Sequence, residues 1–170
     1  MNSTVLHMRN QVSRVVKTGI IRLWVILLFY VLGIISVPII TAAATPKIGD
    51  EYGGGIVFYI DGTGQHGLVA AKADMTGNSL RKKEGFFNWY DAKNAANTFI
   101  NGYSDWLLPN KEQLKQLYDH RSSVGGFEET IYWSSSESEQ NSAWGQYFLN
   151  GEQLVGEKNH NGRVRAVRIF

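Results

Sequence analysis

A long apolar stretch near the start of the chain, residues 23–40, carries no charged side chain. Four basic residues and no acidic residue precede this stretch, and the small residues 42–44 follow it. As a helix it would be about 27 Å long, close to the thickness of the hydrocarbon core of a membrane. A basic, then apolar, then small order is typical of a secretory signal. We therefore predict an N-terminal hydrophobic helix within residues 1–44, acting as a signal peptide cut after Ala44 or as an uncleaved signal anchor.

Strand patterns open the remaining region, residues 45–170, which we predict to form one exported domain. Residues 56–60 are β-branched and aromatic and follow three consecutive glycines, and residues 67–71 form a second apolar run. The turn-forming residues 61–64 separate the two runs. Short apolar runs on either side of such a turn predict a β-hairpin.

Two helical patterns follow the hairpin. Asn88 can cap the first helix, whose apolar positions recur at helical spacing across residues 89–99. Asn110 precedes the second helix, residues 111–118, and Gln113 stands three positions later, which is the spacing of a capping box. Both segments therefore predict amphipathic helices with one apolar face on the core.

The last third of the chain is strand-like and rich in turns. Apolar and aromatic runs occur at residues 131–133, 143–149 and 163–170, and Asn150 with Gly151 forms a strong hairpin turn. A strand at the end of the chain must pair to satisfy its backbone, and the opening hairpin is the natural partner. Strands, two helices and strands in this order predict an α+β fold with a small twisted antiparallel sheet and paired terminal strands.

Charge is distributed unevenly along the chain. The formal net charge of +2 comes from the first 22 residues; the rest carries 13 basic and 15 acidic residues. This slightly acidic remainder argues against nucleic acid as a partner. Three basic residues, Arg163, Arg165 and Arg168, lie in the predicted closing strand, where at least one is expected to form a buried ion pair or to brace loop carbonyls. The absence of cysteine excludes disulfides, thiolate metal sites and lipid attachment by the bacterial lipoprotein route.

Several short motifs, taken together in order, resemble the Lcl C-terminal domain family over roughly residues 48–170. They are Gly54-Gly55-Ile56-Val57-Phe58-Tyr59, Asp105-Trp106-Leu107-Leu108-Pro109, Tyr132-Trp133-Ser134-Ser135-Ser136-Glu137, Ala143-Trp144, Phe148, Gly151, Lys158 and Val164-Arg165-Ala166-Val167-Arg168. The resemblance implies a C-type-lectin-like fold, distantly similar to that of formylglycine-generating enzymes. It also implies an exported bacterial protein, as members of the family are. The family is named for the end domain of a collagen-like bacterial adhesin that binds sulfated polysaccharides.

The sequence departs from the family pattern in a few places. Leu107 stands where Arg is common, Asn110 where Ser or Thr is common, and Gln113 where Glu is usual. The two changes at the helix start keep the capping chemistry, so the fold implied by the resemblance stands. No collagen-like Gly-X-Y tract is present, so the namesake's ligand transfers poorly to this chain.

Candidate ligand-binding residues cluster late in the chain: Trp133, Ser135, Glu137, Asn141, Trp144, Lys158, Asn159 and His160. Aromatic faces stack on the C–H surfaces of sugars, and hydroxyl, amide and charged groups bind sugar hydroxyls. Loops on a rigid scaffold commonly carry such sites. The competing structural interpretation is that Trp133 fills the core, the serines bond irregular backbone, and the remaining polar residues form solvated turns.

Metal and catalytic chemistry have weaker support. Glu137, Glu139 and Asn141 alternate along the chain and leave calcium as the one candidate ion, although no dense Asp/Asn cluster is present. The basic residues 81–83, with Lys158, could bind a sulfated or phosphorylated polymer, or they could lie in a solvated loop. No nucleophile-elbow, zinc-protease or phosphate-loop motif occurs. We therefore predict a domain that is not an enzyme and has no cofactor.

These patterns favour an exported bacterial binding or adhesion module that recognises a glycan or surface polymer through loops of its C-terminal third. The alternative is a structural or protein-interaction subunit of a cell-envelope assembly, and a receptor domain with variable late loops is a third hypothesis. The expected partners are a glycan or an envelope or surface protein, and the membrane through residues 20–40 if the leader is uncleaved. The expected location is the periplasm, the cell surface or the medium, with anchoring to the inner membrane in the uncleaved case.

Overall fold

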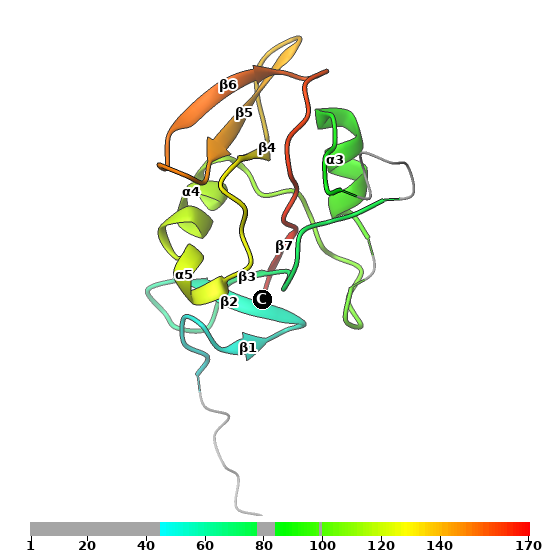
Figure 1. Cartoon of the computed structure of the whole chain (residues 1–170). Coiled ribbons are helices and arrows are strands. Elements are labelled where there is room, and N and C mark those ends of the chain that lie inside the picture. Colours follow the sequence, from blue (N-terminus) through cyan, green and yellow to red (C-terminus); the bar gives the residue numbers. More distant parts are fainter. Residues whose placement is uncertain (1–44, 78–83, 99) are drawn as a thin grey trace, which may run out of the picture. The chain divides into compact units, whose positions relative to one another are not determined.

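The computed structural model describes residues 45–77, 84–98 and 100–170, which belong to one unit, Ala44–Phe170 (Figure 1). The predicted leader, its cleavage position and the basic residues 81–83 lie outside the described residues. Within the described part of the chain, no helix combines the length and apolar character that crossing a membrane requires.

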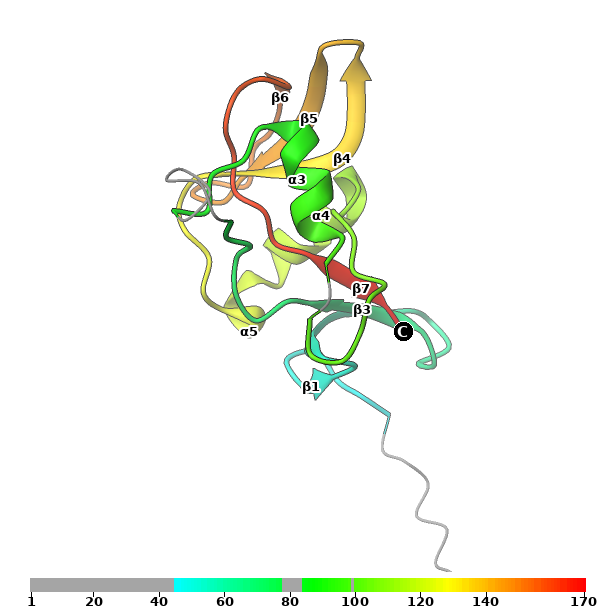
Figure 2. The same ribbon diagram turned by 90° about the vertical axis from the view of Figure 1, so that its right-hand side faces the viewer.

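The first sheet joins the two ends of the domain. It contains β1 (Glu51–Tyr52), β2 (Gly55–Ile60), β3 (Gly67–Ala70) and β7 (Val167–Ile169), in the order β1-β2-β3-β7 with every pair antiparallel. The predicted hairpin is confirmed as β2 and β3. The predicted pairing of the closing strand with that hairpin is also confirmed, since β7 lies beside β3 (Figure 2). The closing strand is shorter than predicted, because Arg163 pairs with Tyr132 of β4 in an isolated parallel bridge and residues 164–166 lie outside both sheets.

A second sheet forms from the late residues. It contains β4 (Ile131–Glu139), β5 (Ser142–Tyr147) and β6 (Gln153–Glu157), in the order β4-β5-β6. The prediction of a single small sheet is therefore wrong. The polar residues after Trp133 also belong to a strand, because their backbone pairs with β5 as far as Glu139. The predicted turn between β5 and β6 is confirmed, and Gly151 there has a φ of 83°.

Three helices occur in the described residues: α3 (Trp89–Ala96), α4 (Lys111–Asp119) and α5 (Arg121–Val124). The Asp91 N–H donates to the Asn88 side chain, and Asn110 with Gln113 forms both bonds of a capping box, so the predicted starts of α3 and α4 are confirmed. Helix α3 ends earlier than predicted, and the short helix α5 was not predicted from the sequence. In Figure 1, α3 lies on one side of the segment that leads into β7, and α4 with α5 lies on the other.

The buried side chains form two clusters. One contains three tryptophans, Trp89, Trp106 and Trp133, packed with Phe87, Leu108 and several valines and alanines. The other includes Phe58, Leu114, Leu117, Tyr132 and Phe148, and thereby joins β2, α4 and the start of β4. Burial of this apolar surface is the main force holding the two sheets and the helices together.

A buried polar network ties the two sheets to the loops. Arg165 is 1% exposed, and its guanidinium donates to Asp74 Oδ1 at 2.7 Å and to the carbonyls of Ala71, Gly125 and Gly126. The Tyr132 hydroxyl donates to Asp74 Oδ2 at 2.7 Å. Burial, followed by the negative charge of Asp74, raises the pKa of Tyr132, so the phenol stays protonated and remains a donor. The expected buried arginine ion pair is confirmed in Arg165.

Candidate functional site

Lys158 is the centre of the best-defined polar arrangement on the late loops. Only 4% of the residue is exposed, although it directly follows β6 on a turn. Its ammonium donates to Glu137 Oε2 at 2.5 Å and to the Gln140 carbonyl at 2.7 Å, and lies 4.6 Å from the centre of the Trp89 ring. Lys158 therefore connects the β6–β7 loop to the β4–β5 hairpin and to the start of α3.

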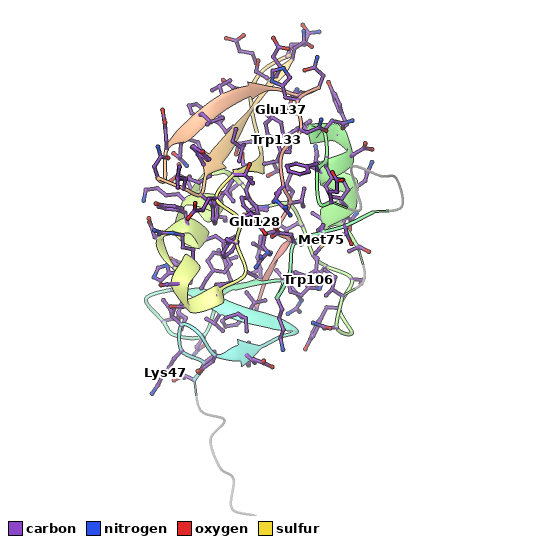
Figure 3. The ribbon with its side chains drawn as sticks, viewed as in Figure 1. Lys47, Met75, Trp106, Glu128, Trp133 and Glu137 are labelled. Carbon is purple, nitrogen blue, oxygen red and sulfur yellow. The ribbon has the colours of Figure 1, made fainter. Side chains whose placement is uncertain are left out.

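Backbone bonds strengthen the same connection. The Lys158 N–H donates to the Asn141 carbonyl at 2.9 Å, and the Trp89 N–H donates to the Lys158 carbonyl at 3.0 Å. Three segments that are far apart in the sequence thus meet at one residue, which fixes the loops on which the neighbouring polar side chains stand. Figure 3 shows Glu137 at the end of the molecule formed by the β4–β5 hairpin, with Trp133 further inside.

A shallow recess of about 300 Å³ lies beside this connection. It is lined by Tyr90 of α3, Asn141 and Ser142 of the β4–β5 hairpin, and Glu157, Lys158 and Asn159 at the end of β6. Tyr90 is 56% exposed, so a large part of its surface is open to solvent. Residues that carry one aromatic ring, two amides, a hydroxyl and a carboxylate therefore line a common space, together with the buried Lys158.

The predicted site residues divide between this recess and other places. Asn141, Lys158 and Asn159 line the recess, and Glu137 lies next to it through its bond to Lys158. His160 is exposed, and its Nε2 lies 3.8 Å from Glu157 Oε2, so His160 lies at the edge of the recess. The remaining three, Trp133, Ser135 and Trp144, have other surroundings.

Trp133 belongs to the core rather than to a ligand surface. It is 2% exposed, and its indole N–H donates to the Phe87 carbonyl at 3.0 Å. The expectation that Trp133 contacts a ligand is therefore wrong for the folded domain, because its ring is covered on all sides that a ligand could approach. A core position was the competing interpretation of this residue, and the burial favours that interpretation.

Trp144 and Ser135 lie in two other environments. The Lys111 ammonium lies 3.2 Å from the centre of the half-buried Trp144 ring, so one face of this indole is already occupied by α4. The Ser135 N–H donates to the Pro109 carbonyl at 2.8 Å, and Ser135 lines a separate recess against α3. Neither residue contributes to the Tyr90 recess.

Sequence reasoning missed Tyr90, Ser142 and Glu157. Tyr90 could have been recognised from the sequence, since it is a large aromatic residue that falls outside the apolar positions of its predicted helix. Such a residue either packs against a neighbouring element or faces solvent, and here it is exposed. Ser142 and Glu157 had no signal of their own, because only the pairing of β5 with β6 places them opposite each other.

The Glu137 carboxyl is held in its charged form by the lysines around it. The hydrogen bond from Lys158, with added attraction from Lys158 and Lys93, holds the pKa of Glu137 below its ordinary value of 4.5. For a carboxyl group with a lowered pKa in the folded state, the stabilisation is present above pH 4.5 and is lost as the pH falls through the folded-state pKa. The ion pair therefore stabilises the loop at neutral pH and releases it in acid.

We expect the Lys158→Met variant to raise the pKa of the Glu137 carboxyl to near its ordinary value. A nuclear magnetic resonance titration of the Glu137 side chain measures this directly. Lys115→Met, which removes an exposed lysine paired with Asp119 on α4, is the matched control and should leave the Glu137 pKa unchanged. An unchanged pKa in Lys158→Met would contradict the assignment of this ion pair.

No group of three or more His, Asp or Glu side chains within the described ranges is arranged to hold a metal ion. Of the residues that suggested calcium, Glu137 is bonded to Lys158, while Glu139 and Asn141 are exposed. The positive charge beside the Glu137 carboxylate therefore comes from the Lys158 ammonium.

The Lcl C-terminal domain model matches residues 65–168, which is more than half of the chain. The chain belongs to the Lcl C-terminal domain family. It is therefore a bacterial domain of a surface-associated family. The match covers β3, all three helices and the second sheet, whereas β1 and β2 precede it. A search of the curated proteins found no match to the chain.

Proposed function

We propose that this Lcl C-terminal domain is an exported binding module that recognises a glycan or surface polymer at the Tyr90 recess. The observation that carries the proposal is the exposed Tyr90 ring beside the amides of Asn141 and Asn159 and the carboxylate of Glu157. An aromatic face supports the apolar side of a sugar ring, while amide and carboxylate groups bind its hydroxyls. The proposal includes binding without catalysis and without a cofactor.

The size and rigidity of the recess support a small polar ligand. Its volume of about 300 Å³ is at the lower end of the range for small-molecule sites. Its walls come from the start of α3, the β4–β5 hairpin and the end of β6, which Lys158 connects, so little ordering is needed when a ligand binds. A single sugar unit of a longer polymer matches these dimensions better than a folded protein surface does.

The proposed fold assignment is the C-type-lectin-like one that the family resemblance implied. An α+β domain whose terminal strands pair and whose second sheet carries the late loops is consistent with it. In the same proposal the domain works outside the cytoplasm, because the N-terminal sequence has the order of an export signal.

We expect Tyr90→Ala to weaken glycan binding by at least about tenfold, equivalent to about 1.4 kcal/mol. Stability should change little, since the Tyr90 side chain is largely exposed. The measurement is binding of the full chain, in mild detergent, to a glycan array that includes sulfated polysaccharides, followed by titration of the best ligand.

Tyr52→Ala is the matched control, because Tyr52 is also an exposed tyrosine, 46% accessible, and lies on β1 away from the recess. This variant should bind like the natural protein. A natural protein that binds no glycan on the array overturns the proposed function. Glycan binding that survives in Tyr90→Ala overturns the site while leaving the function.

A further inference from the structure

Three exposed apolar or aromatic side chains lie at the end of the domain formed by β1. Ile48 is 41% exposed, Tyr52 is 46% exposed and Tyr103 is 36% exposed. Ile48 precedes β1, Tyr52 belongs to β1, and Tyr103 comes from the loop between α3 and α4. We call these three residues and their immediate surroundings the β1 surface.

Contacts between the segments hold the β1 surface in a fixed position. The Asn101 side-chain amide donates to the Gly54 carbonyl at 2.8 Å, and a Cβ built on Gly54 would come within 2.7 Å of the Tyr103 ring. The loop that carries Tyr103 therefore lies directly on the β1–β2 turn. On the other side of this turn, the Tyr52 ring packs edge-on against Phe170, with 4.7 Å between the ring centres.

The charged side chains on these segments, or bonded to them, balance one another. They are three cations and three anions: Lys47, Lys72, Arg168, Asp50, Glu51 and Asp105. Lys72 Nζ lies 2.7 Å from Glu51 Oε2, and Arg168 Nε donates to Asp105 Oδ1 at 2.5 Å. A surface with no net charge is neither strongly attracted to anionic lipids nor repelled by them. Its contacts therefore depend on the apolar and aromatic side chains.

The β1 surface and the Tyr90 recess belong to opposite ends of the domain. Figures 1 and 2 both show β1 at one end and the β4–β5 hairpin, which contributes to the recess, at the other. In Figure 3, Lys47 lies at the β1 end and Glu137 at the hairpin end. A partner on the β1 surface therefore leaves the recess uncovered.

The chain enters the domain at the β1 end. Thr45, where the described part of the chain begins, is three positions before Ile48. In the sequence, only residues 41–44 separate Thr45 from the uncharged run 23–40. The five Cα–Cα steps from residue 40 to Thr45 span at most about 18 Å, even when fully extended. A membrane that holds residues 23–40 therefore lies within that distance, and its headgroup layer of about 5–7 Å takes up part of it.

We propose that the β1 surface contacts the headgroup layer of the membrane in which the uncleaved residues 23–40 are anchored. Tyrosine is enriched at this layer, because its ring is apolar while its hydroxyl bonds water and headgroups. Ile48 and the two tyrosines Tyr52 and Tyr103 supply such groups at the end of the domain that the anchor holds closest to the lipid. The Tyr90 recess then faces away from the membrane. The proposal depends on the anchor and not on glycan binding.

The test uses the full chain in phosphatidylcholine vesicles, with a polarity-sensitive dye on a single introduced cysteine, since the chain has no cysteine of its own. Ser104→Cys places the dye at an exposed position next to Tyr103. Ser138→Cys is the matched control, because Ser138 is an exposed serine next to Glu137 at the hairpin end. We expect the dye at position 104 to emit at shorter wavelength and to lose emission when the lipids carry a nitroxide near the headgroup. The dye at position 138 should show neither change.

A second pair of variants separates contact from mere tethering. In the Ser104→Cys protein, Ile48→Ser with Tyr52→Ser should reduce the loss of emission, because the surface no longer holds to the headgroup layer. Tyr90→Ser removes an exposed tyrosine at the other end and should leave the loss of emission unchanged. Circular dichroism of each variant verifies that the domain is folded.

The mass of the protein recovered from bacterial envelopes is expected to include residues 1–44. A protein that begins at Thr45 overturns the proposal, because the anchor has then been removed. Equal emission loss at positions 104 and 138, or none at either, also overturns it. So does an unchanged loss of emission when Ile48 and Tyr52 are both replaced by serine in a folded protein. A failure of glycan binding alone leaves this proposal intact.

Discussion

Asp74→Ala is expected to lower the free energy of unfolding by about 3–5 kcal/mol. The Asp74 carboxylate accepts from Arg165 at 2.7 Å, from Tyr132 at 2.7 Å and from Arg163 at 3.4 Å. Without it, the charge of Arg165 stays buried with only neutral carbonyls around it, and the Tyr132 hydroxyl loses its acceptor. Removing one member of a buried, hydrogen-bonded ion pair is costly because the other member cannot return to water.

Urea unfolding of the full chain, followed by circular dichroism, measures this loss. Asp119→Ala is the control, because Asp119 pairs with the exposed Lys115 one helical turn away at 2.7 Å. A pair of that kind contributes about 0.3–0.5 kcal/mol. Equal losses in the two variants would show that the Asp74 network does not hold the sheets together.

Trp133→Ala is expected to lower the free energy of unfolding by about 3–5 kcal/mol through the cavity that it leaves. The backbone has been brought close to this ring: a Cβ built on Gly156 or Gly162 would come within 3.0 Å of the indole. Glycine at these two positions allows the β6 strand and the following loop to cover the ring. An alanine at position 133 leaves that space empty and removes one of the two donors to the Phe87 carbonyl, which keeps only the Gly162 N–H.

Trp144→Ala provides the comparison for this prediction, because Trp144 is the same residue type on the next strand but is half-buried. A loss of about 1 kcal/mol is expected there, in the range of an average substitution. Chemical unfolding of both variants decides between core and surface roles. If Trp133→Ala unfolded like the natural protein but lost its ligand, the ring would act in binding.

Local chemistry explains why the sequence predicts the helix starts correctly. The caps at Asn88 and Asn110 depend on bonds to residues three positions later, and the turn at Gly151 depends on a positive φ that glycine adopts without strain. These interactions are complete within a few residues, so the pattern in the chain contains all the information they need. The α+β class follows from the order of these local elements, whereas the pairing of the closing strand was predicted from the need of a terminal strand to satisfy its backbone.

The candidate site depends on long-range contacts that the sequence pattern does not reveal. Lys158 is an ordinary loop lysine in the sequence, yet it is buried between Glu137 and Trp89. Tyr90 becomes part of a recess only because the loop after β6 lies against the start of α3. Burial and ligand geometry are set by neighbours that are distant in the sequence, and a single chain without its fold does not reveal them.

By itself the sequence determined the family, the export-type pattern of the first residues, the capped helices and the strands that form local hairpins. Only the tertiary structure decided that two sheets form instead of one, that Trp133 is core, and that Lys158 is buried between Glu137 and Trp89. The physical reason is that local elements depend on the conformational preferences of neighbouring residues, whereas burial and strand edges depend on which distant segments fill the space around them.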